Sequence, residues 1–245
     1  MSGQHPQPVG PGCWVTGTDT EVGKTRIAAA LLHAAVAQGL CAAGYKPVAA
    51  GVDAQGLNED VEILRAASRP PLSARQVCPA LLSEPCAPHV AAQHMGRALT
   101  LAPLVAGAQA LAAQAPYLVV EGVGGFCVPL NEQHTSADLA RALGLPVVLV
   151  VGLQLGCINH ALLTAQAIAS AGLRLAGWVG NHRDAAMLHR QDTIDTLSLW
   201  LGRDHGAPCL GIVPHLVSPS PQAVLRHLSV PVLQTRLFAS IASAL

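Results

Sequence analysis

Aromatic residues and charges are both scarce in this sequence. Tyr, Phe and Trp together make up 3% of the 245 residues, and Asp, Glu, Lys and Arg make up 11%. With so few aromatic side chains, the core must consist mainly of Ala, Val, Leu and Ile, which suits parallel strands covered by Ala-rich helices. The high apolar content, 51%, argues against a disordered chain.

The sequence also lacks the features of nucleic-acid-binding and membrane proteins. The formal net charge is zero and no long run of Lys or Arg occurs, so we expect neither a nucleic-acid partner nor binding to an anionic membrane. A membrane-spanning helix needs about 20 apolar residues. The longest comparable run, Leu145–Leu155, is shorter and contains Gly152 and Gln154, so we expect it to be a buried strand that ends in a loop.

No C-x-x-C pair occurs among the seven cysteines. An odd number without framework spacing is typical of a reducing compartment, and the cytoplasm is the expected location. Residues 1–11 are rich in Pro, Gly and Gln and lack the apolar core of a secretory signal, so they are predicted to be a flexible tail. No linker or internal repeat follows, and residues 12–245 are expected to form one domain.

Short apolar runs alternate with Ala- and Leu-rich helical stretches along the chain. This alternation predicts right-handed βαβ crossovers, and hence an α/β fold with a mainly parallel sheet flanked by helices. Ligands of such sheets bind beyond the carboxyl ends of the strands. The expected strands are Cys13–Val15, Ala42–Pro47, Tyr117–Glu121, Pro146–Val151, Arg174–Val179, Cys209–Val213 and Pro231–Leu233. The expected helices are Lys24–Gln38, Asp60–Ala67, Ala102–Gln114, Ser136–Leu143, Asn159–Ala171 and Met187–Leu201.

A phosphate-binding loop lies between the first expected strand and the first expected helix. Gly17–Thr25 reads GTDTEVGKT, and its first Gly is one position earlier than in the standard G-x-x-x-x-G-K-[ST] pattern. Gly23 lets the backbone approach phosphate oxygens, and the N–H groups at the helix start bind the anion. Lys24 can place its charge between the β- and γ-phosphates, and Thr25 can bind Mg²⁺. These features predict an ATP-dependent enzyme with a P-loop NTPase fold.

Two carboxylates are candidates for the Mg²⁺ site. Glu121 ends an apolar strand and precedes Gly122-Val123-Gly124-Gly125, the place of the Walker-B acid in nucleotide hydrolases. Asp60 opens an expected helix. Because Asp is a common helix cap, spacing leaves both roles open for Asp60, and its neighbours Glu59 and Glu62 could be confused with it.

Several motifs, in the same order, resemble those of the dethiobiotin synthetases. Gly17–Thr25 resembles the P-loop of this family, and Leu155–His160, which reads LGCINH, resembles a second segment that is highly specific in combination with the first. The other matching segments are Ala43–Val48, Val120–Gly125, Ala176–Asn181 and Gly211–Pro214. The matches span about residues 12–216, whereas the rest of the C-terminal region carries little recognisable signal.

The resemblance implies a homodimeric ligase of biotin biosynthesis that depends on Mg²⁺ and ATP. Members of the family close a cyclic urea on 7,8-diaminononanoate (7,8-diaminopelargonate) with CO₂, and release ADP and phosphate. An amine takes up CO₂ as a carbamate, the carbamate oxygen attacks the γ-phosphoryl group to give a carbamic-phosphoric anhydride, and the second amine displaces phosphate. Since these species are anionic, cations and N–H groups are expected to surround them.

The resemblance also implies roles for residues of this chain. Lys24, Lys46 and Thr20 are the implied catalytic residues, with Lys24 at the phosphates and Lys46 at the carbamate; sequence context alone leaves Lys46 equally readable as a surface lysine. The implied Mg²⁺ ligands are Thr25, Asp60 and Glu121. The implied nucleotide-binding residues are Glu21, Val22, Gly23, Lys24, Thr25, Asp60, Glu121, Gly122, Val123, Gly124, Asn181, His182, Pro214, His215 and Leu216. The implied substrate-binding residues are Thr20, Lys46, Ala50, Gly156, Cys157, Ile158 and Asn159.

Three positions depart from the family pattern. Ala50 stands where a Ser usually lies near the substrate, and the lost hydrogen bond is worth about 1 kcal/mol. Gln154 stands where a Lys can occur, and His182 where some members have Asp.

Gly156–Asn159 begins an expected helix. The resemblance implies that the N-terminus of this helix reaches across the dimer interface and holds the substrate's carboxylate, although a plain Asn cap is also consistent with these residues. His89 is expected to be structural or peripheral.

Two other classes of P-loop protein are alternatives. Amidotransferase-type synthetases, such as the cobyrinate diamide synthases, need an additional glutaminase domain with a nucleophilic Cys, for which this chain is too short. Partition ATPases generally carry a second Lys early in the loop, and Gly17–Glu21 contains none. The histidines lack ligand spacings such as H-E-x-x-H, which argues against a zinc site.

Overall fold

Six parallel strands form the main sheet in the part of the chain that the structure describes. The computed structural model describes residues 9–184, 186–217 and 219–239, so most of the expected tail lies outside the described residues. Across the sheet the strands follow the order β2, β5, β1, β6, β7, β8. Their bounds are β1 Gly12–Gly17, β2 Ala42–Tyr45, β5 Tyr117–Glu121, β6 Val147–Leu153, β7 Leu175–His182 and β8 Cys209–Val213. The predicted α/β class with a parallel sheet is thus confirmed.

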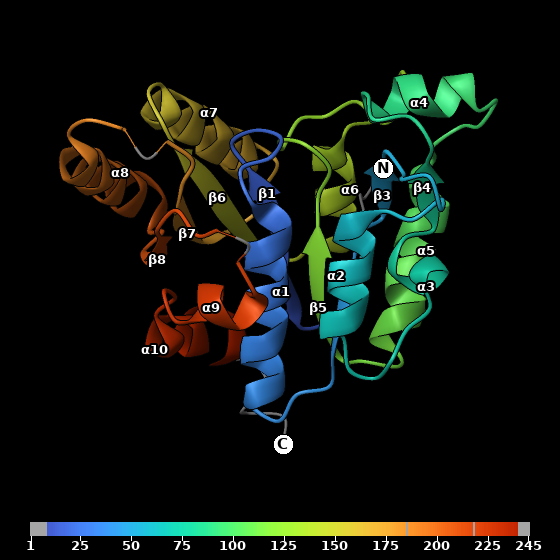
Figure 1. Cartoon of the computed structure of the whole chain (residues 1–245), viewed down its shortest axis with the longest axis horizontal. Coiled ribbons are helices and arrows are strands. Elements are labelled where there is room, and N and C mark those ends of the chain that lie inside the picture. The colour runs from blue at the N-terminus through green and yellow to red at the C-terminus, as the bar shows by residue number, and fades with distance from the viewer. Residues whose placement is uncertain (1–8, 185, 218, 240–245) are drawn as a thin grey trace, which may run out of the picture.

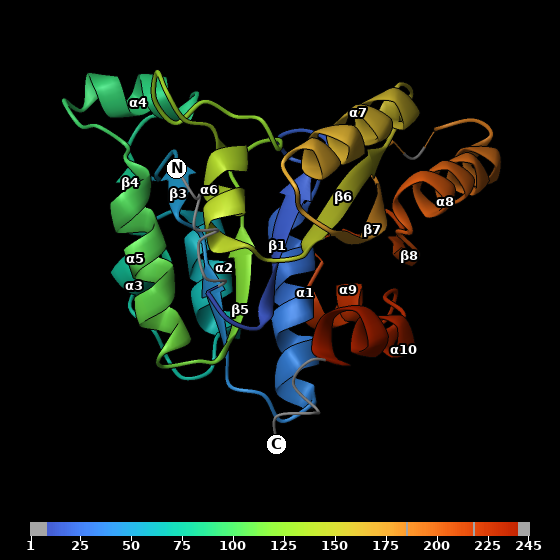
Figure 2. The ribbon, with the colours of Figure 1, turned by 180° about the vertical axis from the view of Figure 1, so that it is seen from behind.

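Helices cover both faces of this sheet. α1 (Lys24–Ala37) and α2 (Glu59–Ala67) lie on one face, whereas α5 (Leu101–Ala112), α6 (Ser136–Leu143) and α7 (Cys157–Ser170) lie on the other (Figures 1 and 2). Many of the buried residues of α1 are alanines, whose small methyl side chains let the helix pack closely against its neighbours. The remaining described helical segments are α3 Ala74–Val77, α4 Pro88–His94, α8 Arg190–His205, α9 Pro221–Leu225, α10 Val230–Leu233 and the π-helical turn η1 Gln234–Phe238.

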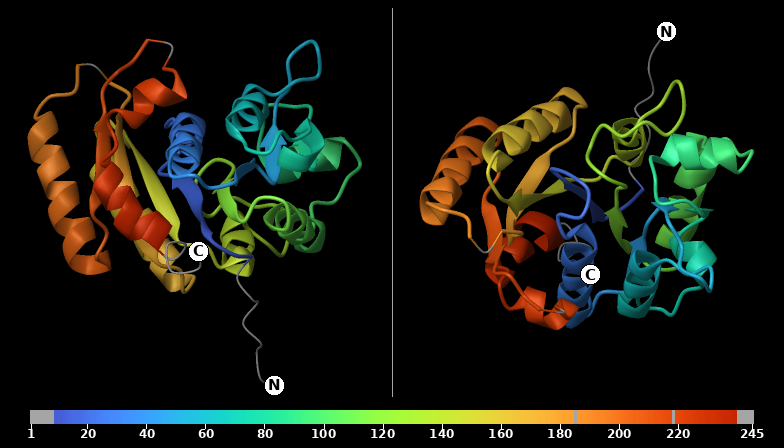
Figure 3. Two further views of the ribbon diagram at one scale, coloured as in Figure 1. Left: turned by 90° about the horizontal axis from the view of Figure 1, so that it is seen from below. Right: turned by 45° about the horizontal axis from the view of Figure 1, so that its top comes forward.

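A second, two-stranded parallel sheet lies beside the β2 edge of the main sheet, together with α3 and α4 (Figure 3). Its strands are β3 (Val48–Ala50) and β4 (Ala80–Leu82). The single strand expected at Ala42–Pro47 ends at Tyr45, because the Lys46 N–H donates to the Val77 carbonyl and Pro47 has no N–H to donate. This break turns the chain away from the main sheet directly at Lys46.

The strand predicted at Pro231–Leu233 is wrong. These residues belong to α10, with Pro231 in the first turn, where the missing N–H would have no helical partner anyway. An apolar run of three residues is too short for periodicity to distinguish a strand from a helix. The other expected elements occur, most of them with shifted ends; the helix expected from Met187, for example, begins at Arg190.

The order of the strands reverses at β1. From β1 the chain crosses by α1 to β2 at the edge, whereas β6, β7 and β8 lie on the other side of β1. At such a reversal the loops beyond neighbouring strands diverge and leave a crevice at their carboxyl ends. The loop after β1 and the end of β5 therefore border this crevice.

In the described part of the chain, no helix combines the length and apolar character that crossing a bilayer requires.

Gly44 of β2 lies where the sheet touches both α1 and α2. An added Cβ would come within 3.0 Å of both Leu32 Cδ1 and Leu64 Cβ. We expect Gly44→Ala to lower the free energy of unfolding by about 1–3 kcal/mol, the usual cost of overpacking, as measured by urea denaturation. Gly202 of α8 is the control, because a Cβ there meets no atom within 4 Å, and Gly202→Ala is expected to stabilise by up to about 1 kcal/mol. Equal stability of the two variants would contradict this packing.

Candidate functional site

The loop between β1 and α1 is fixed by contacts with β6 and β7. Gly23, at the start of α1, has a left-handed φ of 95°, and Asn181 Nδ2 donates a 2.8 Å hydrogen bond to the Val22 carbonyl. A Cβ at Gly23 would lie 2.3 Å from the same Nδ2, so a larger residue would have to displace the Asn181 amide as well as adopt a strained φ. The Thr18 hydroxyl accepts a 3.3 Å hydrogen bond from the Gly152 N–H. The first N–H groups of α1 have no partner within the helix, and such a helix end suits an anion.

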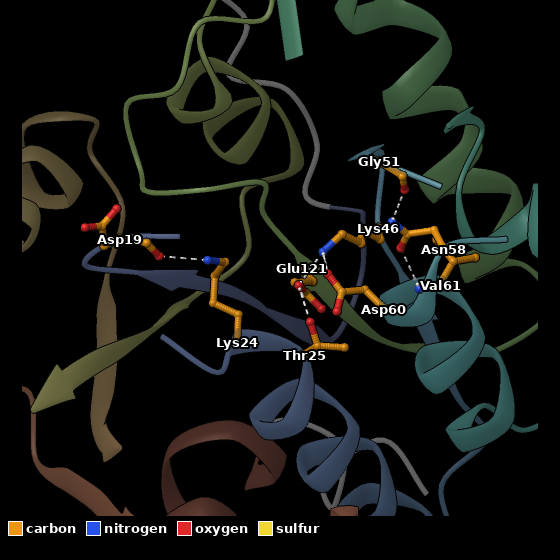
Figure 4. Close-up of polar contacts among 9 residues, drawn as sticks. All are labelled: Asp19, Lys24, Thr25, Lys46, Gly51, Asn58, Asp60, Val61 and Glu121. Atoms are coloured by element: carbon orange, nitrogen blue, oxygen red, sulfur yellow. Dashed lines mark hydrogen bonds and ion pairs between the residues drawn. The ribbon is translucent and has the colours of Figure 1, made fainter. Parts of the chain in front are cut away.

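Lys24 lies over this loop with its ammonium buried. Its Nζ donates a 2.9 Å hydrogen bond to the Asp19 carbonyl (Figure 4). Burial lowers the pKa of Lys24 from 10.5 to about 8; Glu121 opposes this shift and Lys46 adds to it. A phosphate arriving at the loop would therefore meet a cation that has few other partners.

Four polar residues, Thr25, Lys46, Asp60 and Glu121, meet beside the loop; we name them the Lys46 cluster. Lys46 Nζ donates to Glu121 Oε1 at 2.5 Å and to Asp60 Oδ2 at 2.7 Å (Figure 4). The Thr25 hydroxyl donates to the same Glu121 Oε1 at 2.8 Å. The residues come from α1, from the break after β2, from α2 and from the end of β5, so the cluster joins four elements at the carboxyl edge of the sheet.

Lys46 is a buried cation held by two carboxylates. Burial alone would lower the pKa of Lys46, but Glu121 and Asp60 outweigh it and raise the pKa above the ordinary value of 10.5. Burial acts to raise the pKa of Asp60, and Lys46 reverses this and lowers it. Lys46 is thus held as an ammonium ion and Asp60 as a carboxylate at neutral pH, although Lys46 is only 5% exposed.

The oxygen atoms of the Lys46 cluster fit a Mg²⁺ ion. Glu121 is 1% exposed, and its second oxygen, Oε2, has no hydrogen-bond partner in the described part of the chain. A buried carboxylate oxygen without a partner is costly, and a hard cation would satisfy it. Among the described residues no group of three or more His, Cys, Asp or Glu is gathered for a metal. Two carboxylates and a hydroxyl match Mg²⁺, which is usually held by one or two carboxylates, waters and phosphate oxygens.

Lys24 and Lys46 are the only lysines in the sequence, so their titration can be measured directly. In protein labelled with ¹³C,¹⁵N-lysine, we expect the side-chain NMR signal of Lys24 to titrate near pH 8, because burial destabilises its charged form. The Lys46 signal is expected to stay that of an ammonium ion beyond pH 10.5 or up to alkaline unfolding. The variant Lys24→Arg identifies the signals, and two signals that both titrate near 10.5 would contradict the described environments.

A cleft of about 1040 Å³ opens over the loop and the Lys46 cluster. Glu21 lines it with a left-handed φ of 58°, unusual for a residue with a side chain. The predicted site residues that line the cleft are Thr20, Glu21, Gly23, Lys24, Thr25, Lys46, Ala50, Asp60, Glu121, Val123, Gly124, Asn181, His182, Pro214, His215 and Leu216. The structure thus brings together residues that the sequence places almost two hundred positions apart.

The other predicted site residues do not line this cleft. Val22 is buried and offers its carbonyl to Asn181. Gly122 lies against the ring of Trp14, where a Cβ would be 2.9 Å from Cζ2, and its N–H donates to the Val15 carbonyl. The segment Gly156, Cys157, Ile158 and Asn159 forms the N-cap and first turn of α7, with Gly156 as the left-handed N-cap, and it is absent from the cleft lining.

Several residues line the cleft without being among the predicted site residues. Arg26 directly follows the phosphate loop, Glu59 directly precedes Asp60, and their side chains form a 2.6 Å ion pair. Arg183 extends the wall formed by Asn181 and His182, and Pro85–Pro88 forms another part of the wall. Adjacency to the motifs was the available signal for Arg26 and for Glu59, which could be confused with Asp60. Pro88 precedes His89 in a loop that also resembles the dethiobiotin synthetases, and this resemblance was the available signal for Pro85–Pro88. His89 does not line the cleft.

The chain is similar to several known proteins. Residues 12–223 match the model of a family described as an AAA domain. An ATP-dependent dethiobiotin synthetase BioD of Ralstonia nicotianae is 50% identical over 232 residues, which cover 94% of this chain and 100% of that protein. The MinC:MinD cell division protein complex of Aquifex aeolicus has a chain with a TM-score of 0.56 and 12% identity, covering 94% of this chain and 96% of its own. A ParA family ATPase of Chlorobium tepidum TLS has a TM-score of 0.51 and 14% identity, covering 94% and 98%.

The two solved structures share the P-loop fold with this chain and, at such low identity, nothing more specific. The relative from Ralstonia nicotianae is different, since half of its residues are identical along its whole length. The chain belongs to the family of ATP-dependent dethiobiotin synthetases.

Proposed function

We propose that this protein is a Mg²⁺- and ATP-dependent ligase that closes the cyclic urea of dethiobiotin on 7,8-diaminononanoate with CO₂ or bicarbonate, and releases ADP and phosphate. The observation that carries the proposal is the Lys46 cluster: a buried ammonium ion lies between two carboxylates beside a phosphate-binding loop, in one cleft. A cleft of about 1040 Å³ is large enough for a nucleotide and a small second substrate together.

The nucleotide half of the cleft is formed by the loop and by the ends of β7 and β8. The N–H groups at the start of α1 and the ammonium of Lys24 bind the phosphates. Asn181, His182, Pro214, His215 and Leu216 line the far end, where they contact the base. Val22 and Gly122 support this half without facing it, because their backbone atoms are hydrogen bonded to Asn181 and Val15.

The other half of the cleft holds the diamine. Lys46 faces the carbamate that one amine forms with CO₂, and it stabilises the negative charge as the carbamate oxygen attacks the γ-phosphoryl group. The second amine then displaces phosphate and closes the ring. Thr20 and Glu21 lie in the loop between the two substrates, and Ala50 borders the diamine without a hydroxyl to offer. Positioning and charge stabilisation supply the rate, as in other phosphoryl transfers.

Thr25, Asp60 and Glu121 are the residues that would hold Mg²⁺, whose chemistry here is to neutralise charge that develops on the phosphates. The unpartnered Oε2 of Glu121 supports this assignment. Asp60 is available as a ligand because the cap of α2 is Asn58, whose side chain accepts from the Val61 N–H. The competing role of Asp60 as helix cap is therefore already filled.

A second copy of the chain completes the site in this proposal. Gly156, Cys157, Ile158 and Asn159 begin a helix of 14 residues, whose N-terminus suits the carboxylate of the diamine substrate, yet they do not line the cleft of their own chain. A homodimer that places this turn over the partner's cleft accounts for both facts. All seven cysteines are free, which suits a reducing compartment, and we assign the enzyme to the cytoplasm.

The test is incubation of the protein with 7,8-diaminononanoate, bicarbonate, Mg²⁺ and ATP, followed by mass spectrometry for dethiobiotin. We expect dethiobiotin and ADP in equal amounts, and neither product when the diamine or Mg²⁺ is omitted. ADP release that is independent of the diamine, without dethiobiotin, would overturn the proposal and favour a nucleotide-driven switch.

A further inference from the structure

The first turn of α2 is tied to three different elements by three consecutive residues. The Asn58 side chain donates a 2.7 Å hydrogen bond to the Gly51 carbonyl, in the segment after β3. Glu59 forms a 2.6 Å ion pair with Arg26 of α1. Asp60 accepts the 2.7 Å hydrogen bond from Lys46 (Figure 4). The orientation of Asp60 therefore depends on the contacts of its two neighbours.

The ion pair between Arg26 and Glu59 connects α1, which carries Thr25, with α2, which carries Asp60. Arg26 directly follows Thr25, and Glu59 directly precedes Asp60. The pair thus spans from the helix that offers the hydroxyl oxygen to the helix that offers a carboxylate. Both residues line the cleft, but they form no hydrogen bond to the buried members of the cluster.

Open space borders the first turn of α2 on this side. Glu59 lines the main cleft and also a neighbouring hollow of about 550 Å³. The residues of α2 that pack into the core, Val61, Leu64 and Ala67, come later in the helix. The first of these, Val61, directly follows Asp60 and fixes its backbone by packing, so the polar contacts set the orientation of the half-buried Asp60 carboxylate.

We propose that the Arg26–Glu59 ion pair is a positioning device that sets the distance between Thr25 and Asp60, and thereby the geometry of the cation site and of Lys46. The inference rests on the proposed function. The pair itself is exposed, with side-chain accessibilities of 34% for Arg26 and 76% for Glu59, so its loss leaves the fold intact. Its effect is confined to the site, where small displacements of reacting groups are costly.

The signs of the two charges separate positioning from simple electrostatics. Loss of the Arg26 cation would strengthen cation binding through space, whereas loss of the Glu59 carboxylate would weaken it. If the pair positions Asp60, both single variants weaken Mg²⁺ binding. The changes are also non-additive, because either substitution breaks the same contact.

The experiment compares Arg26→Ala, Glu59→Gln, the double variant and the exchanged pair Arg26→Glu with Glu59→Arg. Calorimetric titration of the ADP-saturated protein with Mg²⁺ gives the dissociation constant, and diamine-dependent ADP release gives kcat and KM. Each single variant is expected to bind Mg²⁺ about 10-fold more weakly and to lose about 10-fold in kcat, with the double variant no worse than either. The exchanged pair is expected to recover to within about three-fold of the parent protein.

Arg65→Ala is the matched control, because Arg65 pairs with Glu62 on the same helix and does not line the cleft. We expect it to leave kcat, the Mg²⁺ affinity and Tm unchanged, and Tm should also stay within about 2 °C in the Arg26 and Glu59 variants. Opposite signs for the two single variants, additive losses, or no recovery in the exchanged pair would overturn the inference. If the parent protein makes no dethiobiotin, the proposed function fails, yet the Mg²⁺ titrations still decide on the positioning pair.

Discussion

Lys46→Ala is expected to reduce diamine-dependent ADP release by about 10²–10³-fold, the usual cost of removing one group that stabilises developing negative charge. Lys46 supplies the buried ammonium ion of the cluster, and no other lysine except Lys24 exists in the chain to replace it. Binding of ATP is expected to survive, because Lys24 and the backbone of the phosphate loop are unchanged. Calorimetric titration with ADP and steady-state assays separate these two effects.

The substitution also has a structural consequence that the assay must control. Glu121 is 1% exposed and would keep the Thr25 hydroxyl as its only described partner, so a buried charge would lose its cation. Breaking one side of a buried ion pair costs about 3–5 kcal/mol. The double variant Lys46→Ala with Glu121→Gln removes the unpaired charge, and we expect it to regain most of the lost stability while remaining inactive.

Lys46→Arg provides a second comparison, since it keeps the charge but spreads it over a planar guanidinium group. We expect Lys46→Arg to fold like the parent protein, because the positive charge is kept. It should retain only weak activity, because a guanidinium group cannot take the position of Nζ, which lies 2.5 Å from Glu121 Oε1 and 2.7 Å from Asp60 Oδ2. Activity of Lys46→Ala within a few-fold of the parent protein, with ADP binding intact, would remove Lys46 from the mechanism.

Much of the main sheet could be predicted because its strands are long and apolar. The strands Tyr117–Glu121 and Cys209–Val213 and the helix Ser136–Leu143 have the expected bounds, and the other main strands differ only at their ends. The small elements beside β2 were not predicted. β3 and β4 have three residues each, and a strand of that length has no period of its own; its conformation is set by neighbours that are distant in the sequence.

In the candidate site, too, local motifs could be predicted from the sequence, whereas contacts between residues distant in the sequence could not. The glycines and the lysine of the phosphate loop must lie in consecutive positions, so the sequence shows them as a motif. Asp60 was ambiguous, because a helix-starting Asp reads both as a cap and as a ligand, and only the structure shows that Asn58 is the cap. The pairing of Arg26 with Glu59 could not be predicted, since an ion pair between residues 33 positions apart has no local pattern. The first turn of α7 is the converse case, a recognisable motif that the cleft of a single chain does not use.

Glu121→Gln is the second substitution with a large expected effect, and it concerns the cation. The change keeps the size of the side chain and removes its charge. Lys46 keeps Asp60 as a partner, so no buried charge is left alone, and we expect the free energy of unfolding to stay within about 1 kcal/mol of the parent value.

The affinity for Mg²⁺ should respond much more strongly than stability. Glu121 offers the only described carboxylate oxygen of the cluster that is buried without a partner, and an amide cannot replace its charge at a hard cation. We expect the Mg²⁺ concentration for half-maximal ADP release, and the calorimetric dissociation constant with ADP bound, to rise at least about 100-fold, the upper end of what loss of an outer-shell partner costs. Glu62→Gln removes a half-buried carboxylate of α2 that does not line the main cleft, and this control should change neither value. An unchanged Mg²⁺ dependence in Glu121→Gln would show that the carboxylate at the end of β5 serves Lys46 alone, and that the cation is held elsewhere in the cleft.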